Sequence, residues 1–309
     1  MLKKNKNKKI PIIINCDTGI DDAVALLIAE KSNKLDIRLI TTDVGNVYPI
    51  FSARNCLNIL EMINAKDIPV CAGEGKCFEK ERKRYFAHGK TGLGDYQFEK
   101  HSRKVCSQDA IEKINEVLTN SEEKITIVCL SPATNLAKLL QKYPDAKEKI
   151  ERVVYMVGSI EPLNKGEIPY AEFNASCDPE AAEFLIKSGV RIEIVPMEMG
   201  HTAYLDWEEV FKTKNLNYTG EILEIIFRSY KDRHVKNGIA THDGCAIAYV
   251  TNPELFKTKP VFAKINYYDK IGTGVLCMNF DRKANATACV SMNIKKFKKL
   301  YFKCLKQCK

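Results

Sequence analysis

The segment NCDTGIDD at residues 15–22 places three carboxylates, Asp17, Asp21 and Asp22, within six residues. Clustered carboxylates repel one another and are pushed toward protonation unless a cation neutralises them. All-oxygen ligand sets favour hard cations such as Ca²⁺ or Mg²⁺. Asp21 or Asp22 alone would be a typical helix cap, but a cap does not account for Asp17 as well. The twelfth residue counted from Asp17 is Ile28 and not Glu, which excludes an EF-hand loop, so the spacing indicates another kind of hard-cation site.

Four further groups of polar residues occur along the chain, and each of them alone would most often be structural. Glu172 and Asn174 alternate as in an extended segment, so both side chains are expected to face one side. Carboxylates, amides and a histidine together can bind a polyhydroxyl compound beside a hard cation. The four groups are Gly45-Asn46, His88-Gly89, Glu172 with Asn174, and Thr241-His242-Asp243.

An α/β fold is expected to position these residues, because short apolar runs alternate with helical patterns along the chain. Ligands in such folds bind beyond the C-terminal ends of the parallel strands. Ser131 and Asp178 are expected to cap the helices that follow them. The predicted strands are Ile10–Ile14, Ile37–Thr41, Ile125–Leu130, Val153–Val157, Ile192–Val195, Val261–Asn266 and Ala288–Asn293, and the predicted helices are Asp22–Glu30, Ile50–Ile63, Ala110–Leu118, Ala133–Gln141, Pro179–Lys187, Thr219–Lys236 and Cys245–Val250.

The composition is that of a globular protein, with 309 residues of which 45% are hydrophobic and 28% charged. The net charge of +9 is concentrated at the two ends, with five lysines in residues 1–9 and seven in residues 293–309. Without these twelve lysines, 36 basic residues face 39 acidic ones, which argues against a basic nucleic-acid groove. Apolar residues at three- and four-residue steps in 293–309 predict an amphipathic helix that docks on the rest of the protein, not on a membrane.

The sequence favours a cytoplasmic protein without a membrane segment. No apolar run reaches the roughly 20 residues needed to span a bilayer. The apolar stretch near the start, Ile10–Ile14, is too short for a signal peptide. Twelve cysteines are spread along the chain without a CxxC pair, so they are expected to be reduced and not zinc ligands.

Several separated motifs, taken in order, show that the chain resembles the nucleoside hydrolases, the inosine–uridine-type nucleoside N-ribohydrolases. The opening motif of that family, D-x-D-P/T-G-x-D-D, corresponds to NCDTGIDD followed by AVALLIA. The resemblance extends from about residue 10 to residue 251. The further matches are Ile40-Thr41-Thr42 with Gly45-Asn46, then His88-Gly89, Ser131-Pro132-Ala133-Thr134-Asn135 in place of G-P-L-T-N, Val154-Tyr155-Met156-Val157-Gly158, AEFNASCDPEAA from Ala171, and Thr241-His242-Asp243.

The resemblance implies one α/β domain over residues 10–309, with a central, mostly parallel sheet flanked by helices. A Lys-rich tail at residues 1–9 would precede it, and 293–309 would form its C-terminal helix. Members of the family are usually dimers or tetramers. The implied activity is Ca²⁺-dependent hydrolysis of the N-glycosidic bond of ribonucleosides, which gives ribose and a free base for purine and pyrimidine salvage.

The resemblance also implies roles for individual residues. Ca²⁺ would be held by Asp17, by both oxygens of Asp22, by Asp243 and by the backbone carbonyl of Leu130, with Asp17 as general base on a water. His242 would lie near the base and protonate a purine leaving group. The residues that would bind the substrate are Asp21, Asn46, His88, Met156, Glu172, Asn174 and Asp243. Carboxylates aimed at the ribose suit this reaction, because cleavage of the C–N bond builds positive charge on the sugar ring.

The sequence departs from the family pattern at two positions beside the expected cation. Asn15 replaces the first Asp of the opening motif, which removes a negative charge near the ion. Ser131 replaces a Gly next to the Leu130 carbonyl. The groups that handle the base do not align clearly, and Tyr230 and His234 are the candidates.

Three other functions are weighed against hydrolysis of nucleosides. Asn15 leaves open the alternative of a catalytically inactive relative that binds nucleosides or ribose-like ligands. A hard-metal phosphohydrolase would need Lys or Arg in the matched motifs to bind phosphate, and these motifs contain none. A haloacid-dehalogenase-type phosphatase would need an Asp nucleophile at position 15, where an amide cannot form an aspartyl phosphate.

Overall fold

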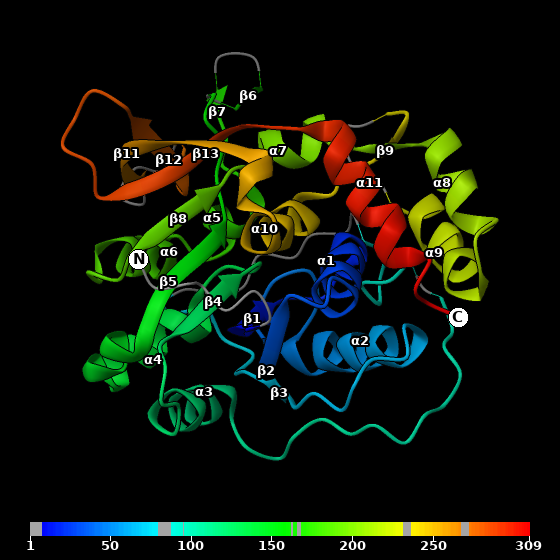
Figure 1. Ribbon diagram of the computed structural model, residues 1–309. Helices are drawn as coiled ribbons and strands as arrows, with labels where there is room; N and C mark the ends of the chain where they lie inside the picture. The colour runs from blue at the N-terminus through cyan, green and yellow to red at the C-terminus, as the bar shows by residue number, and fades with distance from the viewer. Residues whose placement is uncertain are drawn as a thin grey trace.

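The computed structural model describes residues 8–79, 88–94, 96–161, 163–165, 168–230, 236–266 and 272–309. A nine-stranded sheet runs through this part of the chain (Figure 1). The strands from β13 to β3 are parallel, and β11 is antiparallel to both of its neighbours. The strand order is β12 (Val275–Asn279), β11 (Phe256–Asn266), β13 (Ala286–Met292), β8 (Ile192–Val195), β5 (Ile150–Met156), β4 (Ile125–Cys129), β1 (Ile10–Cys16), β2 (Leu35–Thr42) and β3 (Val70–Ala72).

Strand β1 lies inside the sheet, between β4 and β2, and is buried on both faces. Its side chains alternate, so that Ile12 and Ile14 join one hydrophobic cluster and Ile13 joins the other. Helices α1 (Ile20–Lys31), α2 (Pro49–Met62) and α10 (His242–Thr251) contribute to the first cluster. Helices α3 (Ala110–Thr119), α4 (Thr134–Lys142) and α6 (Pro179–Lys187) contribute to the second. The predicted α/β architecture, a mostly parallel sheet between two layers of helices, is confirmed.

Most of the predicted elements are present with slightly different ends. The strand predicted at Ile10–Ile14 extends to Cys16, and the one predicted at Val153–Val157 begins at Ile150. The exception is the long helix expected over Thr219–Lys236, which was wrong, because α9 (Tyr218–Arg228) ends at Arg228. The remaining elements are β6 (Asn164–Lys165), β7 (Ile168–Pro169), α5 (Phe173–Cys177), α7 (Met197–Thr202), β9 (Leu205–Asp206), α8 (Trp207–Lys214), β10 (Gly238–Ile239), α11 (Ile294–Leu305) and the 3₁₀ helices η1 (Pro144–Lys149) and η2 (Pro253–Leu255).

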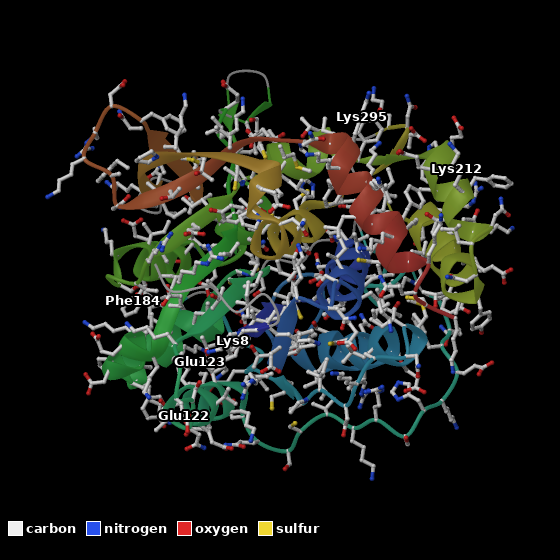
Figure 2. The ribbon with its side chains drawn as sticks, viewed as in Figure 1. Lys8, Glu122, Glu123, Phe184, Lys212 and Lys295 are labelled. Carbon is white, nitrogen blue, oxygen red and sulfur yellow. The ribbon has the colours of Figure 1, made fainter. Side chains whose placement is uncertain are left out.

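The C-terminal helix α11 has the amphipathic pattern that its sequence predicts. Phe297, Tyr301 and Cys304 are buried against the first hydrophobic cluster. Figure 1 shows α11 packed across α1. The lysines of the opposite face are directed outward, as Lys295 is in Figure 2. Lys298 is the partly buried exception, and its Nζ lies 2.5 Å from a carboxylate oxygen of Glu209.

The N-terminal lysines are described only from Lys8 onward, since residues 1–7 lie outside the described residues. Lys8 lies on the surface and forms an ion pair of 2.6 Å with Glu123 (Figure 2). An exposed pair of this kind contributes little to stability. None of the helices in the described part of the chain is both long and apolar enough to cross a lipid bilayer.

Candidate active site

The three clustered aspartates lie where β1 leads into α1, with Asp17 in the connecting turn and Asp21 and Asp22 in the first turn of the helix. Helix α1 begins at Ile20 with Gly19 as its N-cap residue, and Asp22 Oδ2 accepts a hydrogen bond of 2.6 Å from Gly19 N–H. The other oxygen, Asp22 Oδ1, is buried and receives no hydrogen bond from the described residues. One carboxylate oxygen of Asp22 therefore caps helix α1, and the other oxygen is available to a ligand. Asp17 Oδ2 accepts a hydrogen bond of 2.7 Å from Asn46 N–H.

The first turn of α10 brings Asp243 to the same place. Carboxylate oxygens of Asp21, Asp22 and Asp243 lie within 4.8 Å of one another, and all three residues are buried. Burial and the neighbouring carboxylates raise the pKa of both Asp22 and Asp243 well above the usual range. A divalent cation would remove this repulsion. The oxygen-only donor set, with one buried oxygen left without a donor, fits a hard cation.

Asp17 lies beside this triad and is almost completely buried. Burial raises the pKa of its carboxyl well above the usual range, the Asn46 hydrogen bond opposes the rise, and the charges of Asp21, Asp43 and Glu172 add to it. The backbone of Gly45 passes so close to Asp17 that a Cβ at this position would lie 1.9 Å from Asp17 Oδ2. Glycine is required here by close approach of the chain to the carboxylate.

Glu172 and Asn174 lie at the C-terminal ends of β4 and β5, but not in the extended segment expected from their alternation. That expectation was wrong, because Glu172 is the N-cap of α5 and accepts hydrogen bonds from Asn174 N–H at 2.8 Å and Ala175 N–H at 3.2 Å. Glu172 also accepts one of 3.0 Å from Gly158 N–H. Burial raises the pKa of the Glu172 carboxyl, while these hydrogen bonds and the nearby His242 oppose the rise.

The amide of Asn174 joins the ends of two strands. Its Nδ2 donates to the carbonyl oxygens of Leu130 at 3.2 Å and Met156 at 3.0 Å. It also contacts Met156 Sδ at 3.4 Å. The predicted residues from β4, β5 and α5 therefore form one continuous group.

Two histidines lie in aromatic pairs. His88 Nδ1 accepts a hydrogen bond of 3.0 Å from Ile20 N–H and lies 3.9 Å from Asp21 Oδ1, while its ring is 4.9 Å from that of Tyr230. His242 lies edge-on to His201, with ring centroids 4.7 Å apart. Tyr230, a candidate from the sequence, is thus placed beside a predicted site residue, and the other candidate, His234, lies outside the described residues.

Gly200, on α7, is packed against His242, since a Cβ there would lie 2.2 Å from His242 Nδ1. Sequence reasoning did not single out His201, the next residue of α7. Its signal in the sequence was weak, because α7 has only six residues and shows no clear periodicity.

Asp43 is the second residue that sequence reasoning missed. It directly follows β2, at the edge of the sheet where ligands bind, and is completely buried. An acid immediately after an apolar strand was the signal that could have found it. Its partners include Ser131, which was wrongly expected to cap α4. The N-cap of α4 is Ala133, and Ser131 Oγ instead accepts a hydrogen bond of 2.7 Å from Asn15 Nδ2.

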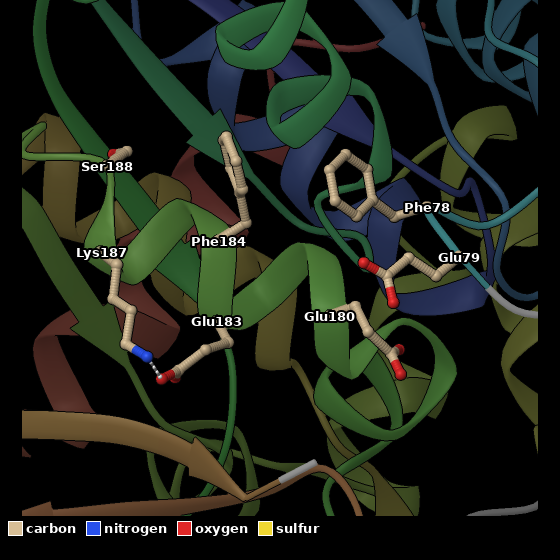
Figure 3. A pocket seen from close by; sticks show the side chains of 7 residues that line it. All are labelled: Phe78, Glu79, Glu180, Glu183, Phe184, Lys187 and Ser188. Carbon is tan, nitrogen blue, oxygen red and sulfur yellow. Dashed lines mark ion pairs between the residues drawn. The ribbon is translucent and has the colours of Figure 1, made fainter. Parts of the chain in front are cut away.

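A separate pocket of about 280 Å³ lies along α6 and contains none of the predicted site residues (Figure 3). The rings of Phe78 and Phe184 stand on one side of it, 5.3 Å apart. Glu183 forms an ion pair of 2.6 Å with Lys187, drawn as a dashed line in Figure 3. Glu79, Glu180 and Glu183 line the pocket, but among the described residues only Asp21, Asp22 and Asp243 form a group of acidic side chains close enough to hold a metal ion.

Comparison with known proteins agrees with this arrangement. Residues 12–299 match the family described as "Inosine-uridine preferring nucleoside hydrolase", and the chain belongs to this family. The non-specific ribonucleoside hydrolase RihC of Escherichia fergusonii is 34% identical over 295 residues, which cover 94% of this chain and 96% of the relative. RihC from a strain of Escherichia coli has the same identity and coverage.

Solved structures show the same fold. A plant nucleoside hydrolase, the PpNRh1 enzyme, superposes with a TM-score of 0.87 at 26% identity, covering 97% of this chain and 99% of that one. A purine-preferring ribonucleoside hydrolase from Gardnerella vaginalis superposes with a TM-score of 0.86 at 24% identity, covering 96% and 98%. The family and the relatives together make the protein a ribonucleoside hydrolase.

Proposed function

We propose that this hydrolase uses Ca²⁺ to cleave the N-glycosidic bond of ribonucleosides. The cation would be held by Asp17, Asp22, Asp243 and the backbone carbonyl of Leu130. The observation that carries this proposal is the buried carboxylate triad of Asp21, Asp22 and Asp243, which contains two of these ligands, Asp22 and Asp243, and in which Asp22 Oδ1 has no donor among the described residues. A bound cation would supply an activated water and electrostatic anchoring of the ribose hydroxyls.

Asp17 would act as general base on the attacking water. Its Oδ2 is held by Asn46 N–H, which fixes the orientation of the carboxylate. Burial raises the pKa of Asp17, which would make the carboxylate a better proton acceptor once a bound cation keeps it ionised. The hydrogen bond from Asn46 therefore supports the proposed position of Asp17, and the burial of Asp17 supports its proposed role as a base.

The remaining carboxylates and amides would bind the ribose. Cleavage builds positive charge on the sugar ring, and the negative charges of Asp21 and Glu172 would stabilise it. Met156 lies beside Asn174, where its side chain would pack on the sugar. The residues proposed to contact the substrate are Asp21, Asn46, His88, Met156, Glu172, Asn174 and Asp243.

His242 would protonate the departing base. It begins α10 directly before Asp243 and lies close enough to Glu172 to lower that residue's pKa. Its edge-on contact with His201 and its tight packing against Gly200 fix the plane of the imidazole ring. A purine leaves more easily when it is protonated, so a held acid at this position suits purine nucleosides.

The substitution Asp17→Asn tests the proposed general base. It should lower ribose release from inosine by about 10²–10⁴-fold, since an amide cannot accept the proton, while circular dichroism stays unchanged. Asp178→Asn is the matched control, because Asp178 is a buried aspartate that caps α6 and an Asn can also cap. Turnover by Asp17→Asn at the rate of the control would overturn this assignment.

We also propose that the protein is a cytoplasmic salvage enzyme that assembles as a dimer or tetramer. Exposed apolar side chains at the start of α2 support assembly, with Tyr48 54% and Phe51 49% exposed. Light scattering after gel filtration would test this assembly, and a monomer at micromolar concentration would contradict it.

A further inference from the structure

Asn15 is completely buried at the end of β1 and is saturated with partners on both sides of its amide. Its Oδ1 accepts hydrogen bonds from Thr41 Oγ1 at 2.8 Å and Asn135 Nδ2 at 2.9 Å. Its Nδ2 donates to Ser131 Oγ at 2.7 Å and to Asp43 Oδ2 at 3.1 Å. The two donors on Oδ1 fix the orientation of the amide, so the NH₂ group must face Asp43.

Asp43 meets Asn15 with a carboxylate that is held by four donors. Its Oδ2 accepts from Asn15 Nδ2, from Asn135 N–H at 3.0 Å and from Ser131 Oγ at 3.5 Å. Its Oδ1 accepts from Val44 N–H at 2.9 Å. A buried acid surrounded in this way by donors is built to hold a negative charge at one fixed point.

The pair joins the backbone segments that carry the proposed cation ligands. Asp43 N–H donates to Cys16 O at 2.8 Å, directly before Asp17. Leu130 N–H donates to Asn15 O at 2.7 Å, which anchors the residue whose carbonyl is a proposed ligand. The chain then runs from Asp43 to Asn46, whose N–H holds Asp17.

The pair needs one carboxylate and one amide, so a change of either residue alone should disrupt it. An Asp at position 15 would set a carboxylate oxygen about 3 Å from Asp43 Oδ2 in a site without water access, where like charges repel strongly. An Asn at position 43 would set two NH₂ or N–H groups against each other. Exchange of both residues restores one carboxylate facing one amide, although Asn135 N–H then faces an NH₂ group and loses Asp43 Oδ2 as its acceptor.

We propose that Asn15 and Asp43 form a positioning pair that holds Asp17 and the Leu130 carbonyl in place for the cation. In this pair the carboxylate stands at position 43 and the amide at position 15, although the opening motif has its acid at position 15. The inference rests on the proposed Ca²⁺ site. The Asp43 carboxylate would then supply, near Asp17, the negative charge that is missing at position 15.

The test compares Asp43→Asn, Asn15→Asp and the exchanged double variant with the native protein. Ca²⁺ affinity is measured by calorimetry on chelator-treated protein, and ribose release from inosine is followed separately. Each single variant should lose about 10–100-fold in Ca²⁺ affinity, as is usual for groups that orient metal ligands. The double variant should bind Ca²⁺ at least about tenfold more tightly than Asn15→Asp, since the pair is coupled.

Glu183→Gln is the matched control. Glu183 is also a buried carboxylate that accepts a backbone hydrogen bond, from Ile265 N–H at 2.7 Å, but it lines the pocket of Figure 3, which contains none of the proposed site residues. Ser131→Ala is the milder variant should Asn15→Asp fail to fold. It removes one donor to Asp43 and should weaken Ca²⁺ binding in the same direction.

If the losses of Ca²⁺ affinity in the two single variants simply add up in the double variant, the pairing is contradicted. Ca²⁺ affinity equal to that of the native protein in both single variants, or in Ser131→Ala, would also contradict it. If the native protein binds no Ca²⁺, the proposed Ca²⁺ site is rejected. The pairing of Asn15 with Asp43 can still be tested by ribose release. Recovery of kcat in the double variant relative to Asn15→Asp then supports the pair, and its absence contradicts it.

Discussion

The carboxylate of Asp17 and the backbone N–H of Asn46 form a hydrogen bond of 2.7 Å across the ends of two neighbouring parallel strands. Asp17 follows β1 and Asn46 follows β2, so the contact depends on the register between them, in which Cys16 pairs with Thr42. The pairing of β1 with β2 thus positions Asp17, the proposed general base, and the loop after β2 supplies the N–H that holds its carboxylate.

Gly45→Ala should disable the enzyme through this support. The added Cβ would lie 1.9 Å from Asp17 Oδ2, so either the loop or the carboxylate must move. A displacement of about 1 Å at a catalytic group can lower the rate by about 10²-fold, and kcat for ribose release should fall by at least that much. Gly75→Ala is the control, since its Cβ would meet only Tyr48 carbons at 3.6 Å or more. Equal kcat in the two variants would show that the contact is unimportant.

Calcium should stabilise the folded protein, because the buried carboxylates repel one another without it. A cation that binds only the folded state at about 100 times its Kd adds about 2.7 kcal/mol to the free energy of unfolding. The thermal midpoint of chelator-treated protein should rise when Ca²⁺ is added, and Asp22→Asn should abolish the rise. A midpoint that does not respond to Ca²⁺ in the native protein would argue against this site.

The stability of the metal-free protein should fall as the pH rises from about 4 to 6. Burial raises the pKa of Asp43 from 3.8 to about 6, against the opposing hydrogen bonds of Asn135, Asn15 and Val44. In this window the folded state keeps a proton that the unfolded chain has lost, so raising the pH favours unfolding by about 3 kcal/mol in all. Denaturant unfolding across this range should show a shallower pH slope for Asp43→Asn than for the native protein. The same slope in both would contradict the assignment.

His242→Phe should slow the release of purines far more than that of a leaving group that needs no proton. With inosine, loss of a general acid should lower kcat by about 10²–10⁴-fold. With p-nitrophenyl riboside, whose leaving group departs as a stable anion, kcat should change little. An equal loss on both substrates would mean that His242 acts in binding or folding instead of proton donation.

Much of the fold follows from local pattern, because buried parallel strands such as β1 are apolar along their whole length. Helix ends were harder to predict. The chain passes through a left-handed conformation at Ala133, with φ of 70°, and this moves the start of α4 away from the cap expected at Ser131. The sequence does not reveal such a turn, since alanine rarely adopts it.

The sequence could bring candidate residues together where motifs follow a strand end, as Asp17 follows β1 and Asn46 follows β2. Asp43 also follows a strand end, but its role, like that of His201, comes from partners that are distant in the sequence. Asp43 meets Asn15 and Asn135 only after three strands have assembled, and His201 meets His242 across two helices. Long-range contacts of this kind have no local signature.

Release of reducing sugar from inosine, adenosine, guanosine, uridine and cytidine, with Ca²⁺ and after chelation, tests the central claim most directly. We expect ribose release that disappears on chelation and returns with Ca²⁺, together with little turnover of deoxyuridine, which lacks the 2′-hydroxyl that the cation would hold. If folded, Ca²⁺-loaded protein releases no ribose from any of these nucleosides, or if full activity remains after chelation, the claim is contradicted.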